Sequence, residues 1–315
     1  MNSSSAPALP ACPRGQKFVT ISPLTSGFIT LPERSFVSPA DSGAVRTVPS
    51  MAFLITHPGL ADGSSKPFYL MFDLGLRSDL NRYTPMQQAH LRNRQPYQLG
   101  PSVARQLADG GIAATEIDAI VISHMHYDHH GDLEDFPTSE VIVGHGAWDI
   151  TAHGLPSKGT HQHFDPHVLP KERTVELPPV GSTSVAPEQR WKWDALGPLP
   201  AAIDLLGDGS VYVLDCPGHL PGHVNLLCRT GPTKWVCLCG DAFHDPRLLS
   251  GERDLGFWAD EDGHSLCIHL DPEGARESIA RLRMLQQLGG IHVVAAHDEH
   301  WHKANQTYFF PNTLP

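Results

Sequence analysis

Residues 117–129, IDAIVISHMHYDH, decide the fold of this chain and the chemistry it can support. The apolar run Ile117 to Ser123 predicts a buried β-strand, and the hexapeptide HMHYDH (residues 124–129) follows it directly. Histidines two positions apart on extended backbone point to the same side, and the turn after them can direct Asp128 and His129 at a second ion. The pattern therefore favours a metal site with ligands for two ions over a histidine-rich surface turn.

Three further apolar runs stop at residues that commonly bind metals. They are residues 211–215, 235–239 and 292–296, which lead to His219, Asp241 and His297, respectively. Strands that end at one edge of a sheet collect their following side chains there. A dinuclear site needs imidazoles from distant segments and a carboxylate to bridge the ions, and these three segments can supply both.

These motifs resemble those of the metallo-β-lactamase superfamily and occur in the order found in that family. The matching pieces are Phe72-Asp73-Leu74-Gly75, the HxHxDH run, Pro217-Gly218-His219, Gly240-Asp241 and His297, spread over about 225 residues. The resemblance implies an α/β (α+β) protein with the αββα four-layer sandwich, in which two sheets lie inside and helices outside. The alternation of predicted strands and helices in two halves agrees with this architecture.

The resemblance also implies the role of each candidate residue. His124, His126 and His219 are expected to bind the first metal, Asp128, His129 and His297 the second, and Asp241 both. The implied cofactors are two divalent metal ions, with Zn²⁺ as the expected identity. Asp73 is expected to brace the histidine loop.

A finer resemblance connects the segment 217–223, PGHLPGH, with the lactonase branch that includes N-acyl homoserine lactonases. In that pattern His219 is the ligand and His223 is a supporting residue. Glyoxalase II relatives share the segment, so it does not select a substrate. Lactonases of this branch commonly carry a tyrosine three residues after the bridging aspartate, where this chain has His244, and we expect His244 to contact the substrate.

Composition limits the classes of partner. The 315 residues contain 23 Lys and Arg against 34 Asp and Glu, giving a formal charge of −11, which disfavours nucleic acid as a substrate. No apolar run is long enough to span a membrane, and the N-terminus has no secretory pattern. The six cysteines are too few for a disulfide framework, and Cys237 and Cys239 are expected to pack within the sheet. A soluble, cytoplasmic protein is expected, and a homodimer is compatible with the sequence.

Residues 1–16 are predicted to be a disordered tail, and residues 17–315 a single domain. Three strands of a mostly antiparallel first sheet are expected at 18–21, 51–56 and 68–72. One helix is predicted between Gly100 and Gly110. Another is predicted from the capping residue Asp271 to Gly289.

An insert at about 150–200, rich in Pro, Gly and His, is predicted to be irregular. Trp191 and Trp193 are expected to pack it onto the body, with a role in a pocket wall as the alternative. The segment from Phe243 to Leu270, including Phe257 and Trp258, is a second candidate wall. Three histidines of the insert are expected in a solvated loop, in preference to a substrate contact or a third metal site: His161, His163 and His167.

The resemblance implies a metal-dependent hydrolase that opens a lactone or lactam of a small molecule by attack of a metal-bound hydroxide, in detoxification or catabolism. Asp128 or His244 would supply a proton to the leaving group. A glyoxalase II-like thioesterase is one alternative, and an iron-dependent oxidoreductase of the sulfur dioxygenase type is another. The sequence leaves open the identity of the ring, the native metal and the oligomeric state.

Overall fold

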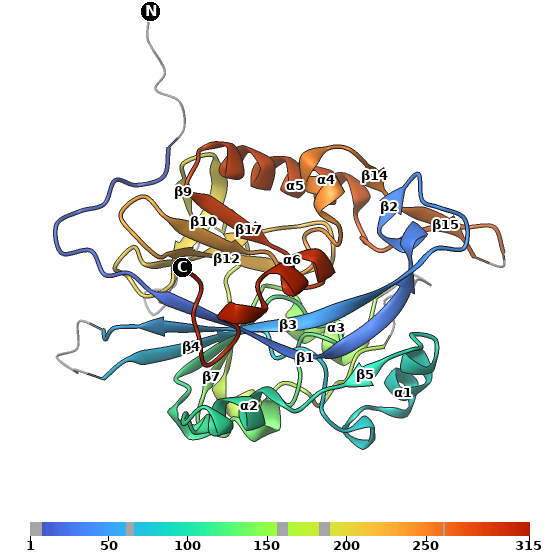
Figure 1. Ribbon diagram of the computed structural model, residues 1–315, viewed down its shortest axis with the longest axis horizontal. Coiled ribbons are helices and arrows are strands. Elements are labelled where there is room, and N and C mark those ends of the chain that lie inside the picture. Colours follow the sequence, from blue (N-terminus) through green and yellow to red (C-terminus); the bar gives the residue numbers. More distant parts are fainter. Residues whose placement is uncertain (1–7, 61–65, 156–162, 183–189, 261) are drawn as a thin grey trace, which may run out of the picture.

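The computed structural model describes residues 8–60, 66–155, 163–182, 190–260 and 262–315 and has two β-sheets between outer helices (Figure 1). The first sheet has seven strands in the order β5-β1-β3-β4-β6-β7-β8. Their bounds are Thr20–Pro32 (β1), Val45–His57 (β3), Phe68–Phe72 (β4), Gln98–Leu99 (β5), Ala119–Ile122 (β6), Glu140–Val143 (β7) and Thr174–Glu176 (β8).

The first sheet is half antiparallel and half parallel. The three strands expected from the sequence are β1, β3 and β4, and they pair in antiparallel fashion. From β4 onward, β6, β7 and β8 are added in parallel. The prediction of a mostly antiparallel sheet is therefore wrong for its second half. Parallel neighbours need crossover connections, and α2 lies in the one between β4 and β6.

The second sheet has six strands in the order β17-β13-β12-β11-β10-β9. Their bounds are Asp194–Leu196 (β9), Leu199–Asp204 (β10), Val211–Asp215 (β11), Val224–Arg229 (β12), Trp235–Leu238 (β13) and Ile291–Val294 (β17). Strands β9 to β13 form antiparallel pairs, and β17 joins β13 in parallel. The remaining strands form two two-stranded sheets. One pairs β2 (Val37–Ser38) with β14 (Asp254–Leu255), and the other pairs β15 (Phe257–Ala259) with β16 (Ser265–Cys267).

The helices are α1 (Pro85–Arg92), α2 (Val103–Asp109), α3 (Ala147–His153), α4 (Pro246–Ser250), α5 (Pro272–Gln287) and α6 (Glu299–Ala304). Both predicted helices are confirmed as α2 and α5. The Asp271 carboxylate accepts a hydrogen bond from the Gly274 N–H at the start of α5. Helix α1 was not predicted, although the Thr84 and Gln87 capping box at its start is a signal readable in the sequence.

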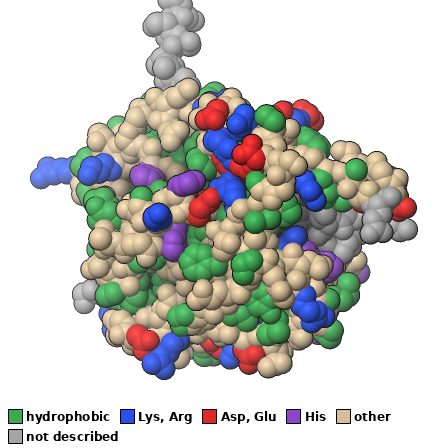
Figure 2. Space-filling model, turned by 45° about the vertical axis from the view of Figure 1, so that its right-hand side comes forward, with side chains coloured by type: hydrophobic (Ala, Val, Ile, Leu, Met, Phe, Trp, Pro, Cys, Tyr) green, Lys and Arg blue, Asp and Glu red, His purple; other side chains and the backbone are tan. Residues whose placement is uncertain are grey.

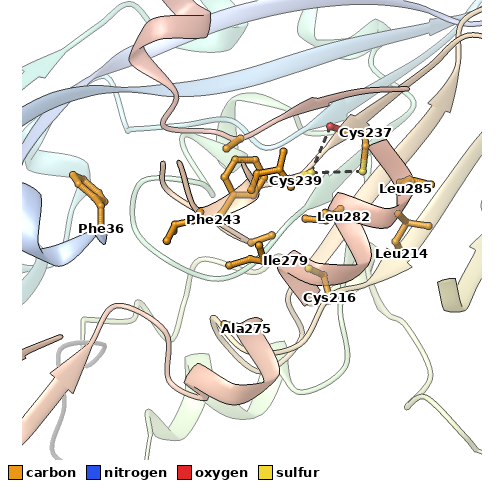
Figure 3. Close-up of a cluster of buried hydrophobic side chains, with 14 of the residues drawn as sticks. Phe36, Leu214, Cys216, Cys237, Cys239, Phe243, Ala275, Ile279, Leu282 and Leu285 are labelled. Atoms are coloured by element: carbon orange, nitrogen blue, oxygen red, sulfur yellow. Dashed lines mark hydrogen bonds between the residues drawn. The ribbon is translucent and has the colours of Figure 1, made fainter. Parts of the chain in front are cut away.

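Alternating side chains on the strands produce the four predicted layers. In β6, Ile120 and Ile122 lie in the cluster under α2 and α3, whereas Ala119 and Val121 lie between the two sheets. The outer face of the second sheet is covered by α5 (Figure 3). The αββα sandwich is thus confirmed.

The cysteines and tryptophans singled out in the sequence have packing roles. Cys237 and Cys239 are buried beneath α5, with their sulfur atoms 3.6 Å apart, and neither forms a disulfide (Figure 3). Trp191 is buried in the cluster between the sheets, and Trp193 packs against it. Both packing predictions are confirmed.

The predicted irregular insert contains regular structure. The end of α3 opens it, β8 extends the first sheet, and β9 with the start of β10 lies at the edge of the second sheet. The expectation of an irregular segment is therefore corrected for these stretches. These strands are short, and the strands beside them provide their burial. Their sequences therefore show little of the alternation of apolar and polar residues that predicts a strand.

Residues 8–16 form no helix or strand but contact the body: Leu9 packs on the α5 cluster, and an Arg229 N–H donates to the Pro10 carbonyl oxygen at 2.6 Å. Residues 1–7 lie outside the described residues, and the extent of the single domain stays a prediction. Among the helices described, none combines the length and apolarity that a membrane crossing requires. Acidic and basic side chains are interspersed on the face shown in Figure 2.

Replacing Leu282 by alanine should lower the free energy of unfolding by roughly 2–5 kcal/mol, because its side chain is 2% exposed between α5 and the second sheet. Met284 on the same helix is 44% exposed, so Met284→Ala should change stability by less than about 0.5 kcal/mol. Urea denaturation of both variants, followed by circular dichroism, measures this difference. Equal stabilities would contradict the assignment of the buried face of α5.

Candidate metal centre

The seven residues predicted as metal ligands converge at one place, where four strands end. The hexapeptide follows β6, His219 follows β11, Asp241 follows β13 and His297 follows β17. The two central sheets bring these strand ends together across the sandwich. Two groups of mutually close ligand atoms result: His124, His126, His219 and Asp241, and Asp128, His129 and His297.

The first group is built from three imidazoles. His126 Nδ1 lies 2.8 Å from His124 Nε2 and 3.1 Å from His219 Nε2. Nitrogen ligands of one tetrahedral zinc ion lie roughly 3.3 Å apart, given Zn–N bonds of about 2.0–2.1 Å. An oxygen of Asp241 lies 3.7 Å from His124 Nε2 and 3.3 Å from His219 Nε2. The group thus presents three nitrogens and one oxygen to a single point.

The second group lies on the other side of the same carboxylate. The other oxygen of Asp241 is 3.2 Å from His129 Nε2 and 3.2 Å from His297 Nε2. An Asp128 oxygen lies 3.6 Å from His297 Nε2. Asp241 therefore offers one oxygen to each group, which is the arrangement expected of a bridging carboxylate.

The electrostatics of Asp241 depend on the imidazoles around it. Burial raises the pKa of this carboxyl, but the facing rings of His129, His297 and His244 outweigh the effect and hold the pKa well below its ordinary value. The side chain is almost fully buried. It is therefore an anion in the interior, in the state in which a carboxylate binds a cation.

Oxygen acceptors fix the orientation of three rings. The Nδ1 of His129 lies 2.9 Å from an Asp73 oxygen, that of His297 lies 2.7 Å from the Pro49 carbonyl oxygen, and that of His124 lies 3.0 Å from Ser123 Oγ. With Nδ1–H donated in this way, each Nε2 presents its lone pair to the centre.

Asp73 braces the histidine loop, as predicted. Its two oxygens accept hydrogen bonds from the Ser123 N–H at 2.7 Å and from the Ser123 hydroxyl at 2.8 Å, in addition to the contact with His129. Asp73 adopts φ 57°, a left-handed conformation that aspartate tolerates better than most residues. The residue thus joins the end of β4 to the end of β6.

His223 supports the site without belonging to either ligand group, as predicted. Its Nδ1 lies 3.1 Å from the Cys216 carbonyl oxygen, and its Nε2 accepts a hydrogen bond from the Asp241 N–H at 3.0 Å. This ring therefore connects the loop that carries His219 with the backbone of the bridging aspartate.

His244 and His269 are two more buried imidazoles beside the first group. His244 Nε2 lies 2.9 Å from the Asp241 oxygen that faces His219, and its ring stacks on Phe36. The His269 ring is 5.1 Å from that of His219 and 5.4 Å from that of His244. The sequence did not indicate His269, because it follows the short hairpin β15–β16 and no motif surrounds it.

The ligand set fits divalent metal ions. His129 Nε2 and the nearest Asp241 oxygen are buried and make no hydrogen bond, although they lie 3.2 Å apart. Buried polar atoms without a partner are rare in folded proteins, and an ion between these atoms would satisfy both. Imidazole and carboxylate ligands suit zinc and other divalent transition metals.

A pocket of about 250 Å³ opens above the two groups. His126, Asp128, His219, Asp241, His244 and His297 line its floor. Trp258 contributes to the wall, which confirms the segment 243–270 as part of the boundary, whereas Trp191 and Trp193 do not line it. A site of this size accommodates part or all of a small molecule.

The three histidines predicted in the solvated loop of the insert have different outcomes. His163 lines the pocket, so the prediction of a solvated loop is wrong for this residue. His167 is exposed, as predicted, and His161 lies outside the described residues. No third metal group within the described parts of the chain includes His163 or His167.

Comparisons with known proteins place the chain in a family. The model of the beta-lactamase superfamily domain matches residues 88–193. The gamma-lactamase MBL2 of Gibberella moniliformis is 30% identical over 185 residues, which are 56% of this chain and 70% of that protein. The gamma-lactamase FDB1 of Fusarium pseudograminearum is 32% identical over 225 residues, 70% of this chain and 51% of that protein. This chain belongs to the metallo-β-lactamase superfamily.

A solved structure agrees with the fold. A quorum-quenching N-acyl homoserine lactone lactonase superimposes with a TM-score of 0.65 and 18% sequence identity, over 95% of this chain and 100% of that chain. The chain spans only about a third to a half of the length of the first curated relatives that it matches. Residues 88–193, which the family model matches, include the hexapeptide.

Asp73→Asn should weaken zinc binding roughly 10–100-fold, because an NH2 group replaces one of the two oxygens that together accept hydrogen bonds from Ser123 and the His129 ring. Asp118→Asn is the matched control: this exposed carboxylate also accepts a backbone N–H, from Tyr69, but lies outside both ligand groups. Competition titration against a chromogenic zinc chelator measures both affinities. Unchanged affinity in Asp73→Asn would show that Ser123 and the loop orient the ring without Asp73.

Proposed function

We propose that the protein is a metal-dependent hydrolase that opens a lactone or lactam ring of a small molecule. The observation that carries the proposal is the pair of ligand groups that share Asp241 at the floor of a pocket. The similarity of the chain to two gamma-lactamases and to the fold of an N-acyl homoserine lactone lactonase supports this class of reaction.

Two divalent ions, which we propose to be Zn²⁺, would be held by the seven ligands and would supply Lewis acidity and a water of lowered pKa. In the reaction, water adds to the carbonyl carbon and the ring C–O or C–N bond breaks. The carbonyl carbon becomes that of a carboxylate, and the expelled ring oxygen or nitrogen takes up a proton to give a hydroxyl or an amine. A pocket residue must therefore move a proton to the leaving atom.

Asp128 and His244 are the two pocket residues to which we assign roles in the reaction. Asp128 lines the pocket floor, and its backbone carbonyl accepts a hydrogen bond from the Ser50 hydroxyl, which fixes the turn. His244 lines the pocket and contacts Asp241 through Nε2. We assign Asp128 as the proton carrier and His244 as the residue that orients the bridging carboxylate and contacts the substrate carbonyl.

The proposal includes a cytoplasmic location and a role in detoxification or catabolism. All six cysteines are free, which agrees with a reducing compartment. Acidic and basic side chains are mixed on the face in Figure 2, which agrees with a small-molecule substrate in preference to nucleic acid.

His126→Ala should lower kcat/KM for γ-lactone and γ-lactam substrates at least about 100-fold and reduce the metal content, because it removes one of three nitrogens from the first group. His153→Ala, at an exposed position paired with Asp149 on α3, should leave both unchanged. Elemental analysis and a colorimetric ring-opening assay measure the two quantities and also distinguish zinc from iron. Full activity and full metal in His126→Ala would refute the proposed centre.

His244→Asn should lower kcat by roughly 10–100-fold while leaving the metal content intact, because His244 contacts Asp241 but belongs to the substrate side of the pocket. KM should change less than kcat if the contact strengthens in the transition state. Steady-state kinetics with parallel metal analysis separates the roles. A loss of metal in proportion to activity would instead make His244 a residue of the metal site itself.

A further inference from the structure

The walls of the pocket above the metal centre are apolar and positively charged. The apolar part includes Ile29, Leu31, Phe36, Trp258 and Ile268. Two arginines, Arg34 and Arg94, also line the pocket. The acidic side chains that line it are Asp128 and Asp241, and both belong to the ligand groups. Every fixed charge on the wall outside the centre is therefore positive.

Neither arginine has an acidic partner among the described residues, a fact that stands out in a chain of net charge −11. The arginines of the neighbouring cavity show the contrast. Arg46 lies 2.6 Å from a Glu299 oxygen, and Arg247 lies 2.6 Å from a Glu33 oxygen. Arg94 hydrogen-bonds the Tyr127 hydroxyl, but no carboxylate of the described residues neutralises either guanidinium, so both charges can pair with an anionic ligand.

Arg94 is held in place by its surroundings. It follows α1, and its backbone carbonyl accepts a hydrogen bond from the Thr30 N–H of β1 at 3.0 Å. Its guanidinium lies beside the buried Tyr127: burial raises the pKa of that phenol, and Arg94 opposes the rise. A guanidinium positioned in this way loses little freedom on binding an anion.

His163 adds a second polar group at the same end of the pocket. Its ring centroid lies 4.4 Å from that of His90, which in turn lies 5.2 Å from the ring of Tyr127. Burial, together with the charge of Arg94, lowers the pKa of His163. Its Nδ1 is buried and makes no hydrogen bond. The pocket thus presents the neutral imidazole of His163 near the guanidinium of Arg94.

We propose that this pocket selects a substrate with an apolar body that carries a carboxylate in addition to the lactone or lactam ring, and that Arg94, assisted by Arg34, binds that carboxylate. The proposal rests on the proposed function and names the class of substrate for it. A planar guanidinium binds a carboxylate through two parallel hydrogen bonds, which gives both affinity and orientation. Holding the pendant carboxylate at the wall would place the ring over the metal centre.

The test uses two γ-lactones that share one apolar chain and differ only at its end, where one has a carboxylate and the other a primary amide. The wild-type protein should favour the carboxylate in kcat/KM by about tenfold or more, the range expected for a charge-assisted pair. Arg94→Met should abolish that preference and leave the amide substrate nearly unaffected. Arg94→Lys, which keeps the charge but loses the paired geometry, should fall between the two.

Arg92→Met is the matched control, because Arg92 is an exposed arginine of α1 that does not line the pocket. It should retain the wild-type preference. Thermal unfolding of each variant separates misfolding from the loss of a contact. A wild-type protein without preference, or an Arg94→Met variant that loses both substrates equally, would overturn the proposal.

Binding of the same two compounds, measured by calorimetry on the zinc-loaded protein, separates this proposal from the proposed function. If neither lactone is hydrolysed but the carboxylate still binds about tenfold more tightly through Arg94, the anion site stands and the hydrolase proposal fails. If both are hydrolysed without an effect of Arg94, the hydrolase proposal stands and the anion site fails.

Discussion

The structure depends on one buried carboxylate, that of Asp241, which stays charged in the interior because imidazoles surround it. The Nε2 atoms of His129, His219, His244 and His297 lie between 2.9 and 3.3 Å from its oxygens. An isolated carboxylate in such a position would be strongly destabilising. The two sheets must therefore hold distant segments in register so that every ring faces this one side chain.

Hydrogen bonds made by residues outside the two ligand groups also hold the segments around Asp241 in place. Asp73, at the end of β4, fixes the loop after β6, and His223 connects the loop after β11 to the backbone of Asp241. The first contact joins the ends of the neighbouring strands β4 and β6, and the second joins the loop between β11 and β12 to the end of β13. Hydrogen bonds of 2.7–3.0 Å thus fix the loops that carry the candidate ligands to the ends of the strands in the two sheets.

The floor and the walls of the pocket differ in chemistry because different parts of the fold form them. The floor is anionic and rich in imidazole, which suits cations, whereas the walls combine aromatic and aliphatic side chains with guanidinium groups. The floor is assembled from strand ends, and part of the wall comes from η1 (Glu33–Ser35), the loop after α1 and the hairpin β15–β16. Loops vary more readily than strand ends, so the wall is where the substrate would be selected.

The sequence by itself indicated the seven residues that converge on the candidate centre, because the HxHxDH run and the residues after three apolar strands carry a local signal. It also determined α5, whose cap, apolar spacing and terminal glycines lie within one segment. Only the tertiary structure decided the rest. Contacts between segments far apart in the chain decide the parallel half of the first sheet, including the pairing of β8 with β7. They also decide the approach of His163, His269 and Arg94 to the centre. The local sequence pattern does not indicate those contacts, because distant segments bury these strands and side chains and their neighbours in the sequence do not.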